Sequence, residues 1–183
     1  MRTKRKASVF ICVYLWTICL CISAAHAAPP LPPAAVAEHP GLKELGEGRL
    51  RFLGIHVYDT SLWTAGQVYS PLNTFALELR YAINIKGRAL TERSIKEMRG
   101  QGWRDEAKLK RWEEEMDRVF PDLKPGDRLV GVSVPGKEAR FYSQEKFLGT
   151  VPDPEFAQAF FGIWLDEKTS EPKLRGKLLK LPD

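Results

Sequence analysis

The segment that most constrains the fold runs from Asp153 to Leu165, because it is predicted to form a helix that is apolar on almost every side. Asp153 suits the N-cap position, and Pro154 suits the first helical position, where its missing N–H has no partner to lose. Apart from the helix ends, Gln158 is the only polar residue. Two apolar stripes follow at helical spacing, Phe156–Phe160–Trp164 and Ala157–Phe161–Leu165. Such a helix has to be covered on nearly all sides by the remaining chain.

Residues 1–27 are predicted to be a secretory signal peptide. Basic residues from Arg2 to Lys6 precede an uncharged run, and Ala25-His26-Ala27 has the small-x-small pattern of a signal-peptidase site. The run nearly reaches the ~18 residues at which a membrane span is considered, so an uncleaved anchor is the alternative. We expect cleavage near Ala27 and a periplasmic or secreted protein without stable membrane insertion.

Charge and cysteine content both change when this segment is removed. The full chain has a formal net charge of +5, and the segment carries four basic residues and no acidic ones, so the remainder has +1 (5 − 4). A nucleic-acid partner is not expected, because phosphate binding needs a concentrated basic face. The cysteines Cys12, Cys19 and Cys21 all lie in the segment, which leaves no thiol for a disulfide. His39 and His56 have no recognised zinc spacing, so neither a metal nor a cofactor is expected.

Residues 28–40 (APPLPPAAVAEHP) are rich in proline and alanine and have no period, which predicts an extended linker. One domain over residues 41–183 is expected to follow. A chain of about 150 residues buries roughly 70% of its unfolded surface, which is enough for one core.

Alternation of apolar and polar residues predicts the strands. Leu50 to Val57 is predicted as the first strand, with residues 58–63 as its continuation or its partner, and Gly46-Glu47-Gly48 as a turn before it. Residues 75–81 alternate most clearly, which indicates an antiparallel sheet with one buried face. Shorter strands are predicted at 129–134, 139–143 and 147–151.

Helices are predicted at 90–99 and 105–119, and a closing helix at 170–179 follows the apolar one. The order of strands, two helices, strands and two helices predicts an α+β domain with helices on one face of a mainly antiparallel sheet. Gly162 lies inside the apolar helix, where glycine is less favourable than alanine by about 1 kcal/mol. We expect another backbone or a bulky ring to approach closely there.

Two motifs of common enzyme classes are incomplete. Residues 131–135 resemble a nucleophile elbow, but Pro135 replaces the second glycine and no helix follows, which disfavours a serine hydrolase. The charged residues of the helix at 105–119 are interpreted as a solvated face with paired charges rather than as an acidic metal site.

Three segments carry a resemblance to a known family. They are GEGRLRFLGIHVYDTSLW at 46–63, FPDLKPGDRL at 120–129 and GTVPDPEFAQAFFGIWLDEKTSEPKLRGKLL at 149–179. They resemble the bacterial branch of the chalcone isomerase-like family. The resemblance implies an open-faced β-sandwich with a cleft between sheet and helices for a flat or elongated apolar molecule. It also implies two kinds of function, because plant members cyclise chalcones to flavanones whereas relatives bind fatty acids or have no known activity.

The catalytic pattern of that family is incomplete in this chain. Residues 52–58 are similar to the family's Phe-Thr-Ala-Ile-Gly-Val-Tyr, so the resemblance puts Leu53 at the catalytic threonine. The family arginine corresponds to Arg49 or Arg51, with the register open by one residue, which on a strand changes the face. The catalytic tyrosine falls in the helical region, where the chain has Trp103 and no tyrosine. At least two of the three catalytic positions are therefore lost.

The leading hypothesis is a non-catalytic periplasmic protein that binds a small apolar molecule such as a fatty acid. Arg49 or Arg51 would pair with the acid group of the ligand. Tyr58, Tyr81 and Trp103 would line the cleft. In the alternative arrangement these arginines face solvent and the rings fill the core.

Two further functions stay open. One is an isomerase or lyase that acts on a chalcone-like or other small substrate with Arg49 or Arg51 and Tyr58. The other is a ligand-free interaction module of the cell envelope. An apolar pocket with one arginine favours the binding protein, an arginine with two hydroxyl donors favours the enzyme, and a filled core favours the module.

Overall fold

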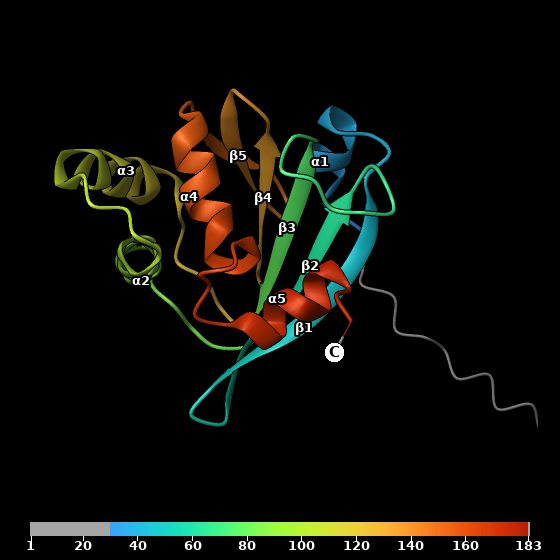
Figure 1. The fold of residues 1–183 in the computed structure, drawn as a ribbon, viewed down its shortest axis with the longest axis horizontal. Helices are drawn as coiled ribbons and strands as arrows, with labels where there is room; N and C mark the ends of the chain where they lie inside the picture. Colours follow the sequence, from blue (N-terminus) through green and yellow to red (C-terminus); the bar gives the residue numbers. More distant parts are fainter. Residues whose placement is uncertain (1–29, 183) are drawn as a thin grey trace, which may run out of the picture.

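The computed structural model describes residues 30–182, so the predicted signal peptide lies outside the described residues. They contain a six-stranded antiparallel sheet in which every strand lies beside its neighbours in sequence (Figure 1). The strands are β1 (Lys43–Phe52), β2 (Ile55–Thr64), β3 (Phe75–Tyr81), β4 (Arg128–Val134), β5 (Glu138–Ser143) and β6 (Phe147–Val151). The predicted α+β architecture with an antiparallel sheet is confirmed.

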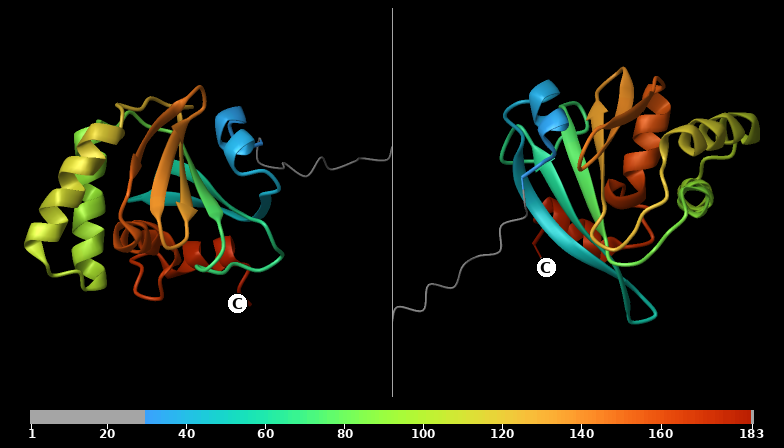
Figure 2. Two further views of the ribbon diagram at one scale, coloured as in Figure 1. Left: turned by 90° about the horizontal axis from the view of Figure 1, so that it is seen from above. Right: turned by 180° about the vertical axis from the view of Figure 1, so that it is seen from behind.

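Five helices accompany the sheet within the described residues. They are α1 (Pro33–Glu38), α2 (Gly87–Gln101), α3 (Glu106–Val119), α4 (Pro154–Leu165) and α5 (Pro172–Leu179). Helices α2 to α5 cover one face, and the short α1 lies on the opposite face (Figure 2). None of the helices in residues 30–182 is both long enough and apolar enough to cross a membrane.

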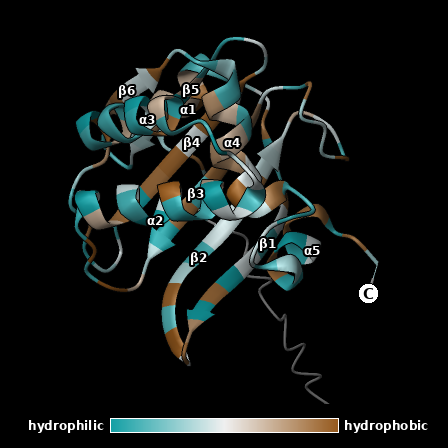
Figure 3. Ribbon diagram, turned by 60° about the vertical axis from the view of Figure 1, so that its left-hand side comes forward, coloured by the Kyte–Doolittle hydropathy of each residue, from teal (hydrophilic) through white to brown (hydrophobic). Residues whose placement is uncertain are grey.

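The first predicted strand is interrupted by a hairpin turn. Strand β1 ends at Phe52, β2 begins at Ile55, and these two residues pair across the turn. Leu53 and Gly54 form the turn with φ values of 49° and 83°, the left-handed values that a type I′ turn requires. The turn projects beyond the rest of the sheet (Figure 3). The prediction of one strand over 50–57 was therefore wrong, because a leucine holds a turn position that usually carries asparagine or glycine.

The glycines that were predicted to form a turn lie inside β1. A Cβ added at Gly46 would lie 2.5 Å from the carbonyl oxygens of Lys177 and Leu178, and one added at Gly48 would clash with the Leu174 side chain. The two glycines therefore allow α5 to pack directly on β1. The turn prediction was wrong because glycines in a strand also mark the close approach of another backbone.

Helix α4 lies in the main core, as its sequence predicted. Asp153 is its N-cap and accepts hydrogen bonds from the backbone N–H groups of Glu155 and Phe156. Both apolar stripes are buried. The surroundings of Gly162 differ from the expectation, because a Cβ added there would meet the amide oxygen of Gln101 at 2.9 Å. The close neighbour is thus a polar side chain of α2, and neither a backbone nor a ring.

Residues 30–39 cover the second face of the sheet, which differs from the extended linker that their composition predicted. The second core consists of Leu31, Ala35, Trp63, Ala76, Val130, Val132 and Tyr142. Glu38 accepts a hydrogen bond from the Tyr142 hydroxyl at 3.0 Å and pairs with Arg140 at 2.6 Å. The helix forms in a proline-rich sequence because Pro33 occupies its first turn, where a proline removes no hydrogen bond.

Candidate functional site

A cavity of about 240 Å³ lies between the β1–β2 hairpin, β3, α2 and the end of α4. Most of its wall is apolar, from Leu50, Phe52, Val57, Ile83, Ile85, Leu90 and Ile163. The rest comes from Tyr58, Tyr81, Trp164, Arg93, Ser94, Glu97, Ser170 and Glu171. An apolar wall with a few polar groups is typical of small-molecule sites.

A bulge in the hairpin shapes one side of this cavity. Leu50 pairs with Tyr58 and Arg51 pairs with His56, so Val57 is an extra residue on β2. An extra residue breaks the alternation of side chains between the two faces of a strand. As a result Val57 and Tyr58, although adjacent in sequence, both line the cavity.

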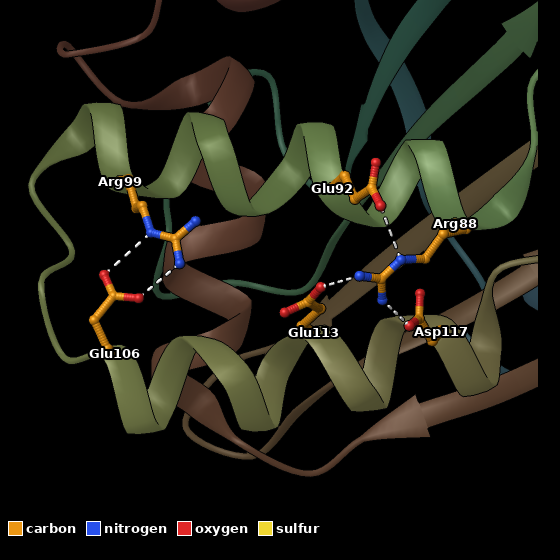
Figure 4. A network of polar contacts seen from close by, with 6 residues as sticks. All are labelled: Arg88, Glu92, Arg99, Glu106, Glu113 and Asp117. Carbon is orange, nitrogen blue, oxygen red and sulfur yellow. Dashed lines mark hydrogen bonds and ion pairs between the residues drawn. The ribbon is translucent and has the colours of Figure 1, made fainter.

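Helix α2 supplies the polar side of the cavity, and ion pairs to α3 hold it in place (Figure 4). Near its start, Arg88 pairs with Glu113 at 2.5 Å and with Asp117. Near its end, Arg99 pairs with Glu106 at 2.6 Å. Exposed ion pairs contribute little to stability one by one. Because these pairs lie at opposite ends of α2, they fix the orientation of the helix.

Arg93 and Glu97 form a polar group at the rim of the cavity. The Arg93 Nη2 atom lies 2.5 Å from Glu97 Oε1, and the two side chains are 52% and 14% exposed. The Ser170 hydroxyl donates to the other oxygen of Glu97 at 2.8 Å. A guanidinium has five N–H donors in a planar fork, and the ion pair with Glu97 engages one end of it. The remaining donors can reach a polar group of a ligand.

Two tyrosine hydroxyls complete the polar groups of the wall. The Trp164 indole N–H donates to the Tyr58 hydroxyl oxygen at 2.8 Å, and the Tyr58 ring packs edge-on against Tyr81 with centroids 5.6 Å apart. Burial raises the pKa of both phenols, and the Trp164 bond offsets only part of this rise for Tyr58. Both hydroxyls therefore stay protonated at neutral pH. The Tyr81 hydroxyl is buried and has no hydrogen-bond partner among the described residues, so it can donate to a ligand atom.

Neither arginine that the resemblance singled out lines the cavity. Arg49 pairs with Asp59, with Nε 2.5 Å from Oδ1, on the face opposite to Leu50. Arg51 is exposed next to the hairpin turn. The arginine in the cavity wall is Arg93. Its only signal in the sequence is a glutamate four residues later on a predicted helix, and such pairs are common on solvated faces.

The aromatic residues of the predicted site divide in the same way. Tyr58 and Tyr81 lie together in the cavity wall, whereas Trp103 packs edge-on against Trp112, with centroids 5.2 Å apart, outside the cavity. Leu53, which the resemblance put at the catalytic threonine, lies at the tip of the hairpin and is 87% exposed. That correspondence is corrected, because a turn occupies the position where a strand was expected. No group of His, Cys, Asp or Glu in residues 30–182 is arranged to hold a metal ion.

Comparisons with known proteins agree with this architecture. The model of the chalcone isomerase-like family matches residues 31–180. A Haemophilus influenzae protein described as uncharacterized is 29% identical over 136 residues, which are 74% of this chain and 66% of that protein, just under two thirds of its length. The crystal structure of an Arabidopsis thaliana fatty-acid-binding protein matches with a TM-score of 0.59 at 13% identity, over 76% of this chain and 87% of that one. At this identity the match shows a shared fold.

Proposed function

The chain belongs to the chalcone isomerase-like family, and on this basis we propose that it is a non-catalytic binding protein for a small apolar molecule with one polar end, such as a fatty acid. The observation that carries the proposal is the apolar cavity with Arg93 at its rim. Burial of hydrocarbon against the wall supplies about 25 cal/mol per Å². The shared fold of the Arabidopsis fatty-acid-binding protein supports this class of ligand.

The polar end of the ligand would lie against Arg93. Glu97 already pairs with this guanidinium, so a ligand carboxylate competes with it and gains less than it would from an unpaired arginine. Glu97 keeps its hydrogen bond from Ser170 when Arg93 turns toward the ligand. Because Arg93 is also half exposed, solvent weakens the attraction. We therefore expect a preference of about tenfold for an acid over the matching alcohol.

The test compares a fatty acid with the fatty alcohol of the same chain length by isothermal titration calorimetry. Arg93→Gln should remove the preference for the acid and leave the affinity for the alcohol within about twofold. Arg49→Gln is the matched control, because Arg49 is an exposed, carboxylate-paired arginine outside the cavity. Absence of binding of either ligand to the wild type would contradict the proposal.

An isomerase or lyase is the second candidate, because Tyr58 and Tyr81 put two hydroxyl groups in the same cavity as Arg93. We expect no acceleration of naringenin chalcone cyclisation. The family's threonine position falls on exposed Leu53, and Arg93 is already paired with Glu97. Each missing preorganised donor lowers the rate by roughly 10² to 10³. Chalcone decay that is clearly faster with protein, and slows again in Tyr81→Phe, would establish the enzyme instead.

We also propose that the protein acts in the periplasm or outside the cell. The basic start of the sequence, its apolar run and Ala25-His26-Ala27 support removal of residues 1–27. N-terminal sequencing of the product of the full gene should begin at Ala28. A product that keeps Met1 and remains in the membrane fraction would contradict this location.

A further inference from the structure

The tip of the β1–β2 hairpin carries an exposed apolar cluster. Phe52, Leu53 and Ile55 are 55%, 87% and 60% exposed, and they lie within four consecutive residues. The hairpin projects beyond the helices, and its end shows brown, apolar segments in Figure 3. A cluster of large apolar side chains on a projecting loop is unusual for a soluble surface and indicates a binding partner.

Leu53 is held in a backbone conformation that disfavours it. Its φ of 49° is in the left-handed region, where a Cβ crowds the following carbonyl oxygen and where glycine or asparagine is preferred. Packing does not explain the leucine, because its side chain is 87% exposed. A strained residue without internal contacts indicates a function for its side chain outside the molecule.

The apolar surface of the tip continues into the cavity. Phe52 belongs to both, since it is more than half exposed and also lines the cavity wall. Leu50 and Val57 follow on the two arms of the hairpin and lead to Tyr58. An apolar molecule at the tip would therefore meet apolar side chains along its way into the cavity.

The charges next to the tip are basic. Arg51 is exposed, donates from Nη1 to the Gly54 carbonyl oxygen at 3.1 Å, and forms no ion pair with another described residue. His56 stands on the opposite arm, and residues 51–56 include no acidic side chain. A cation beside exposed apolar side chains is complementary to a surface with anionic headgroups.

We propose that Phe52, Leu53 and Ile55 insert into the interface of a bilayer that contains anionic lipid, with Arg51 at the level of the headgroups. A lipid surface fits this tip better than a protein does, because a narrow, convex cluster requires no complementary pocket in a bilayer. The docking is peripheral and reversible. Transfer of a ligand between bilayer and cavity follows from it and rests on the proposed function.

The first experiment is flotation with vesicles of phosphatidylcholine alone, or with about 30% phosphatidylglycerol, using protein purified from cells that express the full chain. The wild type should float with the anionic vesicles. Leu53→Asn should lower the bound fraction constant at least about tenfold, because one inserted apolar side chain is lost, and should not lower the thermal midpoint, because asparagine tolerates left-handed φ. Leu72→Asn is the matched control, since Leu72 is 83% exposed in the loop between β2 and β3.

A second measurement locates the inserted residue directly. Leu53→Trp should add fluorescence that brominated lipid quenches, whereas the fluorescence added by Leu72→Trp should not be quenched. The comparison is valid whether or not a leader is attached, because a leader would be the same in both variants. Arg51→Gln should weaken binding to the anionic vesicles only.

The proposal is separable from ligand binding. Arg93→Gln should lose its preference for the acid and still bind vesicles like the wild type, so failure of one idea does not imply failure of the other. A wild type that does not float with anionic vesicles, or Leu53→Asn that floats equally well, would overturn the docking surface. Equal quenching at positions 53 and 72 would do the same.

Discussion

Tyr81 is the single residue whose environment is hardest to explain by folding alone. Its side chain is only 2% exposed, and its hydroxyl has no hydrogen-bond partner in the described part of the chain. A buried, unpaired hydroxyl lowers stability by about 1–3 kcal/mol. The ring contributes to the core in any case, so the hydroxyl is the part that the proposed ligand accounts for.

The first prediction compares two neighbouring hydroxyls. Tyr81→Phe should leave the free energy of unfolding of the ligand-free protein unchanged or raise it by up to about 1 kcal/mol, because no bond is lost. Tyr58→Phe should lower it by about 1–2 kcal/mol, because the buried indole N–H of Trp164 loses its acceptor. Urea denaturation measures both. A loss above about 1 kcal/mol in Tyr81→Phe would show that this hydroxyl has a partner.

At the scale of elements, the start of α4 depends on one carboxylate. Burial would raise the pKa of Asp153, but hydrogen bonds from the Trp112 indole at 2.9 Å and from the backbone of Phe156 and Glu155 outweigh burial and lower it. The unfolded state therefore binds more protons than the folded state at acid pH. This contribution is complete above the unfolded value of 3.8 and is lost as the pH falls through the folded pKa.

The second prediction follows from that sign. Asp153→Asn keeps the N-cap and an acceptor for Trp112 but removes the charge. The wild type should be more stable than this variant by about 1 kcal/mol near pH 6, and the difference should vanish as the pH approaches about 3. Denaturation curves over this range test it. A difference that does not change with pH would mean that the charge plays no part.

The third prediction concerns the contact between β1 and α5. Gly46→Ala should lower the free energy of unfolding by about 2 kcal/mol or more, because its Cβ would overlap two backbone carbonyl oxygens of α5 that cannot move alone. Gly176→Ala is the matched control within α5, where nothing lies within 4 Å of the added Cβ. It should stabilise the protein by about 0.5–1 kcal/mol, the difference in helix propensity. Similar effects at both positions would contradict direct packing of α5 on Gly46.

At the scale of the whole molecule, the sheet has a core on each face. Helices α2 to α5 cover the main core, and the segment around α1 covers the second one. Tyr142 and Arg140 hold this segment through Glu38. A domain that began after residue 41 would therefore leave part of its sheet uncovered.

The fourth prediction is that a chain starting at residue 42 is less stable than one starting at residue 28. Exposure of Val130, Val132 and their neighbours should lower the free energy of unfolding by about 2–4 kcal/mol. Glu38→Gln tests the polar part alone, and its effect should stay below about 1 kcal/mol because the pair is partly exposed. Equal stability of the long and short chains would show that residues 28–41 are only a linker.

The sequence by itself determined the elements whose signals are local. Helix α4 follows from an N-cap, a proline and two apolar stripes, and β3 follows from strict alternation between Phe75 and Tyr81. Such patterns depend on contacts within a few residues, so they do not require knowledge of the partner surfaces. Their order was also sufficient for the α+β class and for the family.

Only the tertiary structure decided where the cavity lies and which side chains line it. Replacing a continuous strand by a turn at Leu53, followed by a bulge at Val57, changed the faces that the residues of β1 and β2 occupy. The predicted arginines thereby came to lie outside the cavity, and Arg93 reached its rim because α3 orients α2. Such outcomes depend on pairing register and on contacts between distant segments, where a shift of one residue moves a side chain to the opposite face.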